Sequence, residues 1–466
     1  MKKPNEIIDK LRYLNRLLID TSKTTKEIAA REETLVRALD QVQDSLQRSQ
    51  GLLQTVEESI TRWEQADRLT GECVRRMKYV NLEYFPAMYD RQRKILLAGF
   101  YGARNLGDEL MFRKVYEDLD VRKDQIYVLM CDNDGLDVFD YPGINILHYP
   151  KTKYDYNFLA REFDVLIFGG GAIIDDGAYR LEESYTYDMG KIFIELSLAF
   201  IEKGKKVFPL ALSASSDLTD PGYIRKLKRV AEGSADFSVR DRYSAALIRR
   251  LTGVEVKVVN DIVFSYDLSS EGVPEKPGDD RKVIVGIVWI CYENVKRACI
   301  ELIGRLQEHY GDRLEIRLIP FYDYRSCDKI FYEAMAAEIS GVPIRICEMP
   351  GNFRETCDQI RGCDLLISMR YHGALIGMMA GRKTYSLLYS EHSHYYNKMT
   401  DLYEKCGKPG RLTGTAEELY QKIVSEEEDQ GPEERPLLDN QEYWKILSGI
   451  SADFREGRIN HCEVKA

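Results

Sequence analysis

From Lys94 onward the sequence alternates short apolar runs, most of which end in Gly or Asp, with amphipathic stretches of helical spacing. KILLAGF, QIYVLM, FDVLIFGGG, KKVFPLALS and VEVKVVNDIVFSY are runs of this kind. Continuous apolar strands that alternate with helices are typical of a parallel, doubly wound sheet. The pattern therefore predicts an α/β fold of Rossmann-like type.

One stretch rich in Pro, Gly and acidic residues, SSEGVPEKPGDD, interrupts this alternation, which then restarts with RKVIVGIVWI. Such composition is typical of a linker between domains. We predict one Rossmann-like domain over 94–268, a second over 281–425, and a C-terminal helix and tail over 436–466. Tandem domains of this kind bind ligands between them, outside the carboxyl ends of their strands.

Residues 1–90 differ from the rest, with almost no Gly and little Pro. Apolar side chains recur there at a spacing of three or four residues from Ile7 to Trp63. This length exceeds the three or four heptads of a credible coiled coil. We favour a helical coiled coil that makes a homo-oligomer, and the alternative is a helix that folds back on its own chain.

Composition excludes several classes of function. A formal net charge of -10 argues against a general nucleic-acid or membrane-surface binder. The ten cysteines form no CxxC and no Cys/His pair at zinc spacing, so we expect neither a disulfide framework nor a metal site. The first twenty residues lack the apolar core of a signal peptide, and IFIELSLAFIEKG is too short to span a membrane. We expect a cytoplasmic protein, which could lie at the inner face of the membrane through partners.

Two glycine-rich loops follow predicted strands, GFYGARNLGDE and FGGGAIIDD. Glycine lets the backbone approach a ligand closely, and the N–H groups at a helix start favour an anion. The alternative for the first loop is an ordinary turn in which Asp108 caps the helix; for the second we favour a ligand. The predicted substrate-binding residues in these loops are Gly99, Gly102, Asn105, Gly107, Asp108, Gly169, Gly170 and Gly171.

Two further segments bring basic residues to strand ends. Arg240, with Asp241 available to orient it, could bind a phosphate or carboxylate, or Asp241 and Ser244 could instead cap the next helix. The strand CDLLISMR delivers Arg370 and His372, which share a face if both remain extended. His372 can exchange a proton near neutral pH, so it is the acid/base candidate, with a purely structural histidine as the alternative.

A last group follows the next strand, with His392, His394 and Lys398 close together. The two histidines could bind a metal, but no third ligand stands at a convincing spacing, so we predict no metal site. We predict instead that His392 and Lys398 contact the substrate.

The segments GFYGARNLGDE, FDVLIFGGGAIIDD, SVRDRYS and CDLLISMRYHGALIGMMAG occur in this order between Lys94 and Gly407. Together they resemble the polysaccharide pyruvyl transferase family. The resemblance implies a GT-B-like fold and an enzyme that transfers a pyruvyl group from phosphoenolpyruvate to a sugar residue. The acceptor would belong to a cell-surface polysaccharide or its lipid-linked precursor, and the product would be a cyclic ketal. Phosphoenolpyruvate is a co-substrate here, and no cofactor or metal is implied.

The resemblance also assigns roles. His372 matches the functional histidine of the family, and Arg370 and Arg240 match two of its arginines, so these three are the predicted catalytic residues. The family often has Tyr-x-x-Lys after the next strand. Here His392 falls at the lysine position, and Tyr395-Tyr396-Asn397-Lys398 restores the pattern after a short insertion. We favour Lys398.

Two other functions remain open. A GT-B glycosyltransferase that uses a nucleotide sugar would share the two domains and the phosphate-binding loops. A scaffold that has lost catalysis would use the coiled coil to dock partners. Consumption of phosphoenolpyruvate, rather than release of a nucleotide, would distinguish the pyruvyl transferase from the glycosyltransferase.

Overall fold

The computed structural model describes residues 92–131, 143–177, 188–214, 217–268, 282–323, 327–388, 393–427, 433–436 and 438–456. The chain divides into two units, and all of these residues belong to the second unit, Val80–Ala466. The predicted coiled coil over 1–90, the predicted linker and His392 lie outside the described residues. Among the described helices, none is long and apolar enough to cross a membrane.

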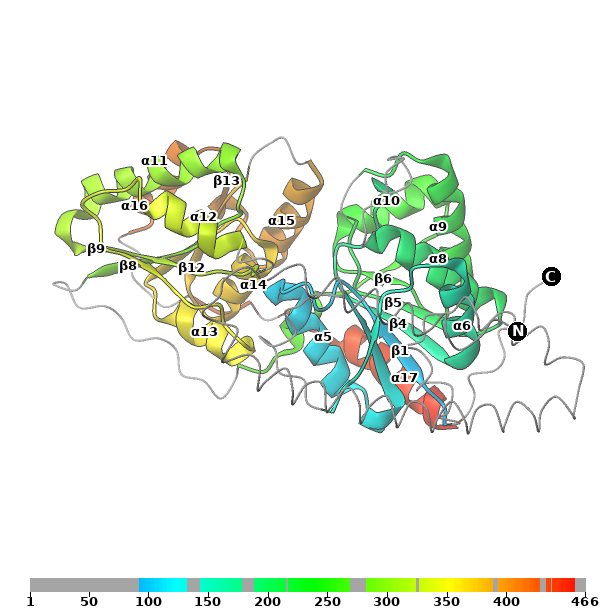
Figure 1. The fold of residues 1–466 in the computed structure, drawn as a ribbon. Coiled ribbons are helices and arrows are strands. Elements are labelled where there is room, and N and C mark those ends of the chain that lie inside the picture. Colours follow the sequence, from blue (N-terminus) through cyan, green and yellow to red (C-terminus); the bar gives the residue numbers. More distant parts are fainter. Residues whose placement is uncertain are drawn as a thin grey trace, which may run out of the picture. The chain divides into compact units, whose positions relative to one another are not determined.

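A parallel sheet of order β3-β2-β1-β4-β5 forms the first half (Figure 1). β1 and β4 are buried along their whole length, as continuous apolar strands in a parallel sheet require. A short parallel pair, β6 and β7, follows this sheet. The strands are β1 (Ile95–Ala98), β2 (Ile126–Met130), β3 (Asn145–His148), β4 (Val165–Gly169), β5 (Lys206–Leu210), β6 (Ser238–Val239) and β7 (Lys257–Val258). The helices are α5 (Leu106–Asp118), α6 (Lys153–Glu162), α8 (Met189–Glu202), α9 (Pro221–Gly233) and α10 (Arg242–Thr252), with short 3-10 helices η2 (Lys123–Gln125) and η4 (Ile262–Ser265).

The second half repeats this plan with a parallel sheet of order β10-β9-β8-β11-β12-β13. Its strands are β8 (Val283–Val288), β9 (Leu314–Leu318), β10 (Ile344–Ile346), β11 (Leu365–Ser368), β12 (Lys383–Leu387) and β13 (Leu412–Thr413). Its helices are α11 (Glu293–Tyr310), α12 (Cys327–Ala336), α13 (Phe353–Arg361), α14 (Tyr371–Met379), α15 (Ser393–Lys405) and α16 (Ala416–Ser425), with η5 (Gly311–Arg313) and η7 (Pro409–Arg411).

Three apolar clusters cover the two sheets. One face of the first sheet packs on α6, α8 and α9, and one face of the second packs on α11, α12 and α16. The third cluster begins under α5 on the other face of the first sheet and continues into α13 and α14 of the second half. The two halves therefore share one continuous apolar core.

The last helix, α17 (Gln441–Glu456), returns to the first half, where Figure 1 shows it beside β1 and α5. The hydroxyl of Tyr443 donates to Asp118 Oδ2 at 2.8 Å, and Arg93 Nη1 donates to the Phe454 carbonyl at 2.6 Å. The side chains of α17 also complete the core under α5. The first half is thus built from chain on both sides of the second.

The strand order places the predicted loops together. β1 lies between β2 and β4, and β8 lies between β9 and β11, so the connections reverse direction at these strands. Open α/β sheets bind ligands outside the strand ends at such switch points. The loops that follow β1, β4, β8 and β11 all lie there.

One predicted strand is much shorter than its sequence pattern suggests. VEVKVVNDIVFSY forms only the two-residue strand β7, and the chain then turns into η4. Asp261 causes the change, because its side chain accepts a hydrogen bond from Val263 N at 2.9 Å and so caps η4. The prediction of a continued strand was wrong, and the turn brings Asp261 next to Arg240.

Candidate active site

Three side chains from distant parts of the chain meet where the two halves join. Arg240 follows β6, Asp261 precedes η4, and His372 is the second residue of α14. Arg240 Nη1 donates to Asp261 Oδ2 at 2.7 Å. His372 Nε2 lies 3.3 Å from Arg240 Nη1 and 3.4 Å from Asp261 Oδ2. We call these three residues the Arg240 cluster, and both halves are needed to form it.

The Arg240 cluster is buried yet charged. Arg240 is 2% exposed and His372 is 8% exposed. Burial alone would raise the pKa of Asp261, but His372 and Arg240 outweigh it and lower that pKa below its ordinary value. Burial likewise opposes the charge of Arg240, but Asp261 outweighs it and raises the arginine pKa. The guanidinium also stacks on Tyr371, with its Cζ 4.3 Å from the ring centroid.

The start of α5 lies against this cluster. A side chain at Gly107 would collide with the imidazole of His372, so glycine allows the helix end to approach the histidine. In the part of the chain that the structure describes, the N-cap residue Asn105 makes no side-chain capping hydrogen bond. The first-turn N–H groups of a helix have no intrahelical partner and carry partial positive charge. Leu106 N already donates to the Phe321 carbonyl, so an anion beside His372 would meet the remaining first-turn N–H groups of α5.

Two ionisable groups near the cluster have pKa values close to neutrality. Burial raises the pKa of Asp108 to about 6, against the opposing charges of His372, Arg240 and Lys398. Burial and the charge of Arg240 lower the pKa of Lys398 to about 7, with Asp241 and Asp108 opposing. Groups perturbed by both burial and specific charges are typical of functional sites.

The loop after β1 also connects the two halves through hydrogen bonds and an ion pair. Leu106 N donates to the Phe321 carbonyl at 2.9 Å, and Asp323 N donates to the Arg104 carbonyl at 3.0 Å. Arg104 Nη1 pairs with Asp323 Oδ2 at 3.1 Å. The loop after β1 therefore pairs with the segment after β9, which holds α5 in place beside His372.

The sequence suggested that Arg370 and His372 could share a face, but in the structure the two side chains contact different partners. It is the N-cap of α14, and the helix begins at Tyr371, so His372 is helical and the two residues do not continue one extended face. Arg370 Nη2 donates to Asp328 Oδ1 at 2.5 Å. Asp328 Oδ2 in turn accepts from the backbone N–H groups of Phe321 and Tyr322, both at 2.9 Å. Arg370 and Asp328 thus form a second cluster, which we call the Arg370 cluster, beside the Arg240 cluster that contains His372.

Asp241 and Ser244 hold secondary structure. Asp241 caps α10 by accepting from Ser244 N at 2.7 Å, and it accepts from the Ser213 hydroxyl at 2.6 Å. The Ser244 hydroxyl accepts from Ala214 N at 2.8 Å. Asp261, rather than Asp241, orients the Arg240 guanidinium, so the geometry follows the capping alternative at this position.

The predicted glycines divide into two groups. A side chain at Gly99 or Gly169 would collide with Tyr101, whose hydroxyl donates to the Gly169 carbonyl at 2.6 Å. Gly102 and Gly170 have φ values of 74° and 83°, which glycine adopts without strain. These four glycines shape the two turns. Gly107 and Gly171 instead face functional groups. Gly107 faces His372, and a Cβ at Gly171 would lie 3.2 Å from Asp108 Oδ1.

The sequence predictions missed Asp261, Asp328 and Tyr371. The dipeptide Asn260-Asp261 after an apolar run was the available signal for the first, because these residues start turns and caps. Asp328 stands near the start of a predicted helix and gave no comparable signal. Of the remaining predictions, Lys398 lies buried on α15, and His392 lies outside the described residues.

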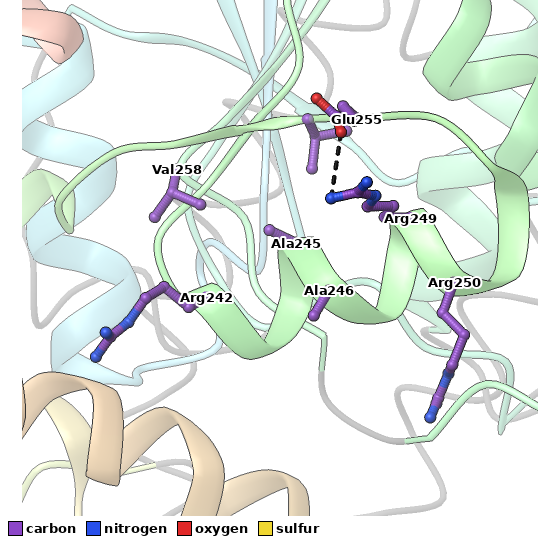
Figure 2. A pocket seen from close by; sticks show the side chains of 8 residues that line it. Arg242, Ala245, Ala246, Arg249, Arg250, Glu255 and Val258 are labelled. Atoms are coloured by element: carbon purple, nitrogen blue, oxygen red, sulfur yellow. Dashed lines mark ion pairs between the residues drawn. The ribbon is translucent and has the colours of Figure 1, made fainter.

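A hollow of about 620 Å³ lies on the surface of α10 and is separate from these clusters (Figure 2). Arg249 there pairs with Glu255 at 3.3 Å. Arg242 reaches α15, where it pairs with Asp401 and Glu404, both at 2.5 Å. None of the predicted site residues lines this hollow. Two of its arginines, Arg242 and Arg249, bind carboxylates of the chain itself, and Arg242 also connects the two halves.

Two parallel α/β halves that join around buried acidic and basic groups define a two-domain α/β protein with a candidate active site between its halves. The model of the polysaccharide pyruvyl transferase family matches residues 105–391, and the chain belongs to that family. The matched segment runs from the start of α5 past β12, so it contains Arg240, Asp261, Arg370 and His372.

Comparison with solved structures supports the fold. The S. aureus MnaA–UDP co-structure is similar with a TM-score of 0.50 at 11% identity, over 79% of this chain and 98% of that one. UDP-GlcNAc 2-epimerase from Methanocaldococcus jannaschii matches with a TM-score of 0.47 at 13% identity, over 78% and 100%. The likeness to the S. aureus protein shows a fold of GT-B-like type. No curated protein matches the chain.

Proposed function

We propose that the protein transfers a pyruvyl group from phosphoenolpyruvate to a sugar residue of a cell-surface polysaccharide or its lipid-linked precursor, forming a cyclic ketal. Membership of the polysaccharide pyruvyl transferase family supports this reaction. The observation that carries the proposal is the Arg240 cluster beside the start of α5. There a buried arginine, a histidine and a helix N-terminus converge.

Phosphoenolpyruvate carries a phosphate and a carboxylate, so its site must supply several positive groups. Arg240 Nε is buried and makes no hydrogen bond within the described residues, which leaves a guanidinium donor for a ligand oxygen. Lys398 is buried near Arg240, and the first-turn N–H groups of α5 add neutral donors. We assign the phosphate to Arg240, Lys398 and the α5 N-terminus. Arg370, in the adjoining cluster, binds the carboxylate.

The chemistry follows from the donor. Proton transfer to the methylene carbon of phosphoenolpyruvate makes C2 an oxocarbenium-like electrophile. One sugar hydroxyl attacks C2 and loses its proton, inorganic phosphate leaves, and the second hydroxyl closes the ketal. The two hydroxyls lose two protons, of which one ends on the methylene carbon and the other on the released phosphate, so an acid/base group near the donor must shuttle protons.

We assign this shuttle to His372, with Asp261 as its positioning partner. An imidazole beside a carboxylate keeps a defined orientation. Arg240 stabilises the negative charge that develops on the departing phosphate, and Arg370 pairs with the carboxylate. Asp108, with a pKa of about 6, is the second group that can hold a proton near neutral pH.

The remaining parts of the proposal concern assembly. We infer that residues 1–90 associate chains through a coiled coil, on the strength of their heptad-like spacing. The proposed reaction uses phosphoenolpyruvate as a co-substrate and no cofactor, since the acid/base and anion-binding groups named above account for each step. Light scattering of the full chain against a chain beginning at Val80 tests the association.

The reaction is tested by measuring phosphate release and pyruvylated product from phosphoenolpyruvate with a panel of free and lipid-linked glycans. His372→Ala and Arg370→Ala should abolish turnover, whereas Arg250→Ala on the exposed face of α10 should retain it. Release of a nucleotide from nucleotide sugars would favour a glycosyltransferase instead. A wild-type protein that neither turns over nor binds phosphoenolpyruvate would refute the proposal.

A further inference from the structure

Two cysteines lie in contact next to the Arg370 cluster. Cys291 stands on the loop after β8, and Cys327 is the first residue of α12. Their Sγ atoms are 2.6 Å apart although 36 residues separate them in the sequence. Of the eight cysteines that the structure describes, five are buried, whereas Cys291, Cys327 and Cys406 are partly exposed. The pair is therefore both close and accessible to a small reagent.

The fold, rather than a mobile side chain, brings these sulfurs together. The hydroxyl of Tyr332 on α12 accepts from Trp289 N at 2.8 Å and donates to the Trp289 carbonyl at 3.1 Å. Tyr332 and Trp289 are both fully buried. These bonds hold α12 against the loop after β8 at Trp289, which lies two residues before Cys291. A disulfide requires such a fixed approach of two backbones.

A metal ion is the competing occupant, because Cys291, Cys327 and Asp328 could supply three ligands. The carboxylate is already committed, however. Asp328 Oδ1 accepts from Arg370 at 2.5 Å, and Oδ2 accepts from Phe321 N and Tyr322 N at 2.9 Å each. The positive charge of Arg370 would also oppose a cation at this place. The geometry favours a pair of thiols that react with each other.

We infer that Cys291 and Cys327 form a reversible disulfide that fixes the first turn of α12 and so controls Asp328 and Arg370. Asp328 directly follows Cys327, so a covalent tie to the loop after β8 restrains the carboxylate that holds Arg370. In the reduced protein this turn adjusts when Arg370 engages the substrate. In the oxidised protein it does not, and donor binding weakens. This last consequence depends on the proposed function, whereas the disulfide itself does not.

The oxidant we name is a small-molecule disulfide. The Cys327 thiolate attacks one sulfur of the oxidant, releasing the first thiol and leaving a mixed disulfide. Cys291 then attacks the Cys327 sulfur and releases the second thiol. Two cysteine S–H bonds and one S–S bond break, one S–S bond forms, and both protons end on the released thiols, so the oxidant is reduced by two electrons.

The environment of Cys291 sets the rates of this exchange. Burial, the contact with Cys327 and the charge of Asp328 raise the pKa of Cys291 to about 12. A thiol of high pKa forms little thiolate at neutral pH, so the second step is slow. The same thiol is a poor leaving group, so reductive attack on the Cys327 sulfur, which expels Cys291, is slow as well. The bridge should therefore form and break over long incubations.

The bridge is tested on the full chain equilibrated in oxidised and reduced glutathione at several ratios. Alkylation, proteolysis and mass spectrometry under non-reducing conditions should find a peptide pair joined between Cys291 and Cys327 in oxidising buffer only. Cys291→Ser and Cys327→Ser should each lose it, and Cys406→Ser, which changes a partly exposed cysteine elsewhere, should keep it. Two free thiols, or only a mixed disulfide at Cys327, in every buffer would overturn the inference.

The effect of the disulfide on substrate binding is measured separately, through the KM for phosphoenolpyruvate. The KM for phosphoenolpyruvate should rise at least about threefold on oxidation and recover with dithiothreitol, and Cys291→Ser should not respond to either treatment. A bridge that forms without changing KM would overturn the control but not the disulfide. If the protein turns over no phosphoenolpyruvate, the peptide map still decides whether the bridge exists. Zinc retained through dialysis, and lost in both serine variants, would replace the disulfide with a metal site.

Discussion

Asp261 Oδ2 lies 2.7 Å from Arg240 Nη1 and 3.4 Å from His372 Nε2, so one carboxylate oxygen serves a residue from each half of the protein. A single buried charge therefore couples the formation of the anion site to the orientation of the acid/base group.

Asp261→Asn keeps the size of the side chain and removes its charge. Breaking a buried ion pair leaves Arg240 uncompensated, so we expect a loss of about 3 kcal/mol in the free energy of unfolding. Phosphate release should fall by about 100-fold or more, because His372 loses its partner. Asp241→Asn, which alters the cap of α10 and the hydrogen bond from the Ser213 hydroxyl but leaves Asp261 paired with Arg240, should cost about 1 to 2 kcal/mol. Urea unfolding and initial rates measure both, and equal effects at the two positions would contradict this account.

Gly107→Ala tests the close approach of α5 to His372. The added methyl collides with the imidazole, so the ring must move and kcat should fall by about tenfold or more while the chain stays folded. Gly304→Ala on α11 is the matched control, since nothing lies within 4 Å of the added Cβ there. That control should be neutral or stabilise by up to about 1 kcal/mol. Unchanged kcat in Gly107→Ala would show that His372 is not held where the structure places it.

The pKa of Asp108 gives a pH dependence of stability. Its folded value is raised from 3.8 to about 6, so the native protein binds more protons than the unfolded chain between these values. The contribution of Asp108 to stability is therefore fully present below pH 4 and is lost as the pH rises through about 6. In Asp108→Asn this decrease in stability with rising pH should be absent. Denaturant unfolding of both proteins from pH 4 to 7 measures it, and parallel curves would contradict the raised pKa.

The lowered pKa of Lys398 predicts that the protein takes up a proton when it binds phosphoenolpyruvate. Its pKa of about 7 leaves it mostly neutral at pH 8, and a bound phosphate would raise that pKa and charge the amine. Titration calorimetry at pH 8 in buffers of different ionisation enthalpy should show uptake approaching one proton per phosphoenolpyruvate. The uptake should shrink at pH 6, where the amine is already charged, and Lys398→Met should lose it. Identical heats in all buffers would rule out this role.

The sequence patterns were sufficient to locate the strands and the loops at their carboxyl ends, because apolar runs and glycines are local signals. These patterns could not predict which side chains pair inside the site. Arg240 finds Asp261 through a turn that sequence periodicity read as a strand, and Arg370 finds Asp328 from 42 residues away. The register of α14 mattered as well, since its start at Tyr371 separates the directions of Arg370 and His372. Such pairings depend on tertiary packing rather than on spacing.

The return of α17 to the first half has a consequence for synthesis of the protein. The apolar face of this helix completes the core beneath α5, yet the ribosome makes it only after the whole second half. The first half therefore emerges with part of its interior uncovered and waits for about two hundred further residues before it can close. Because domains otherwise fold as they emerge, this chain gains its finished core, and with it the placement of α5, only after its second half has been synthesised.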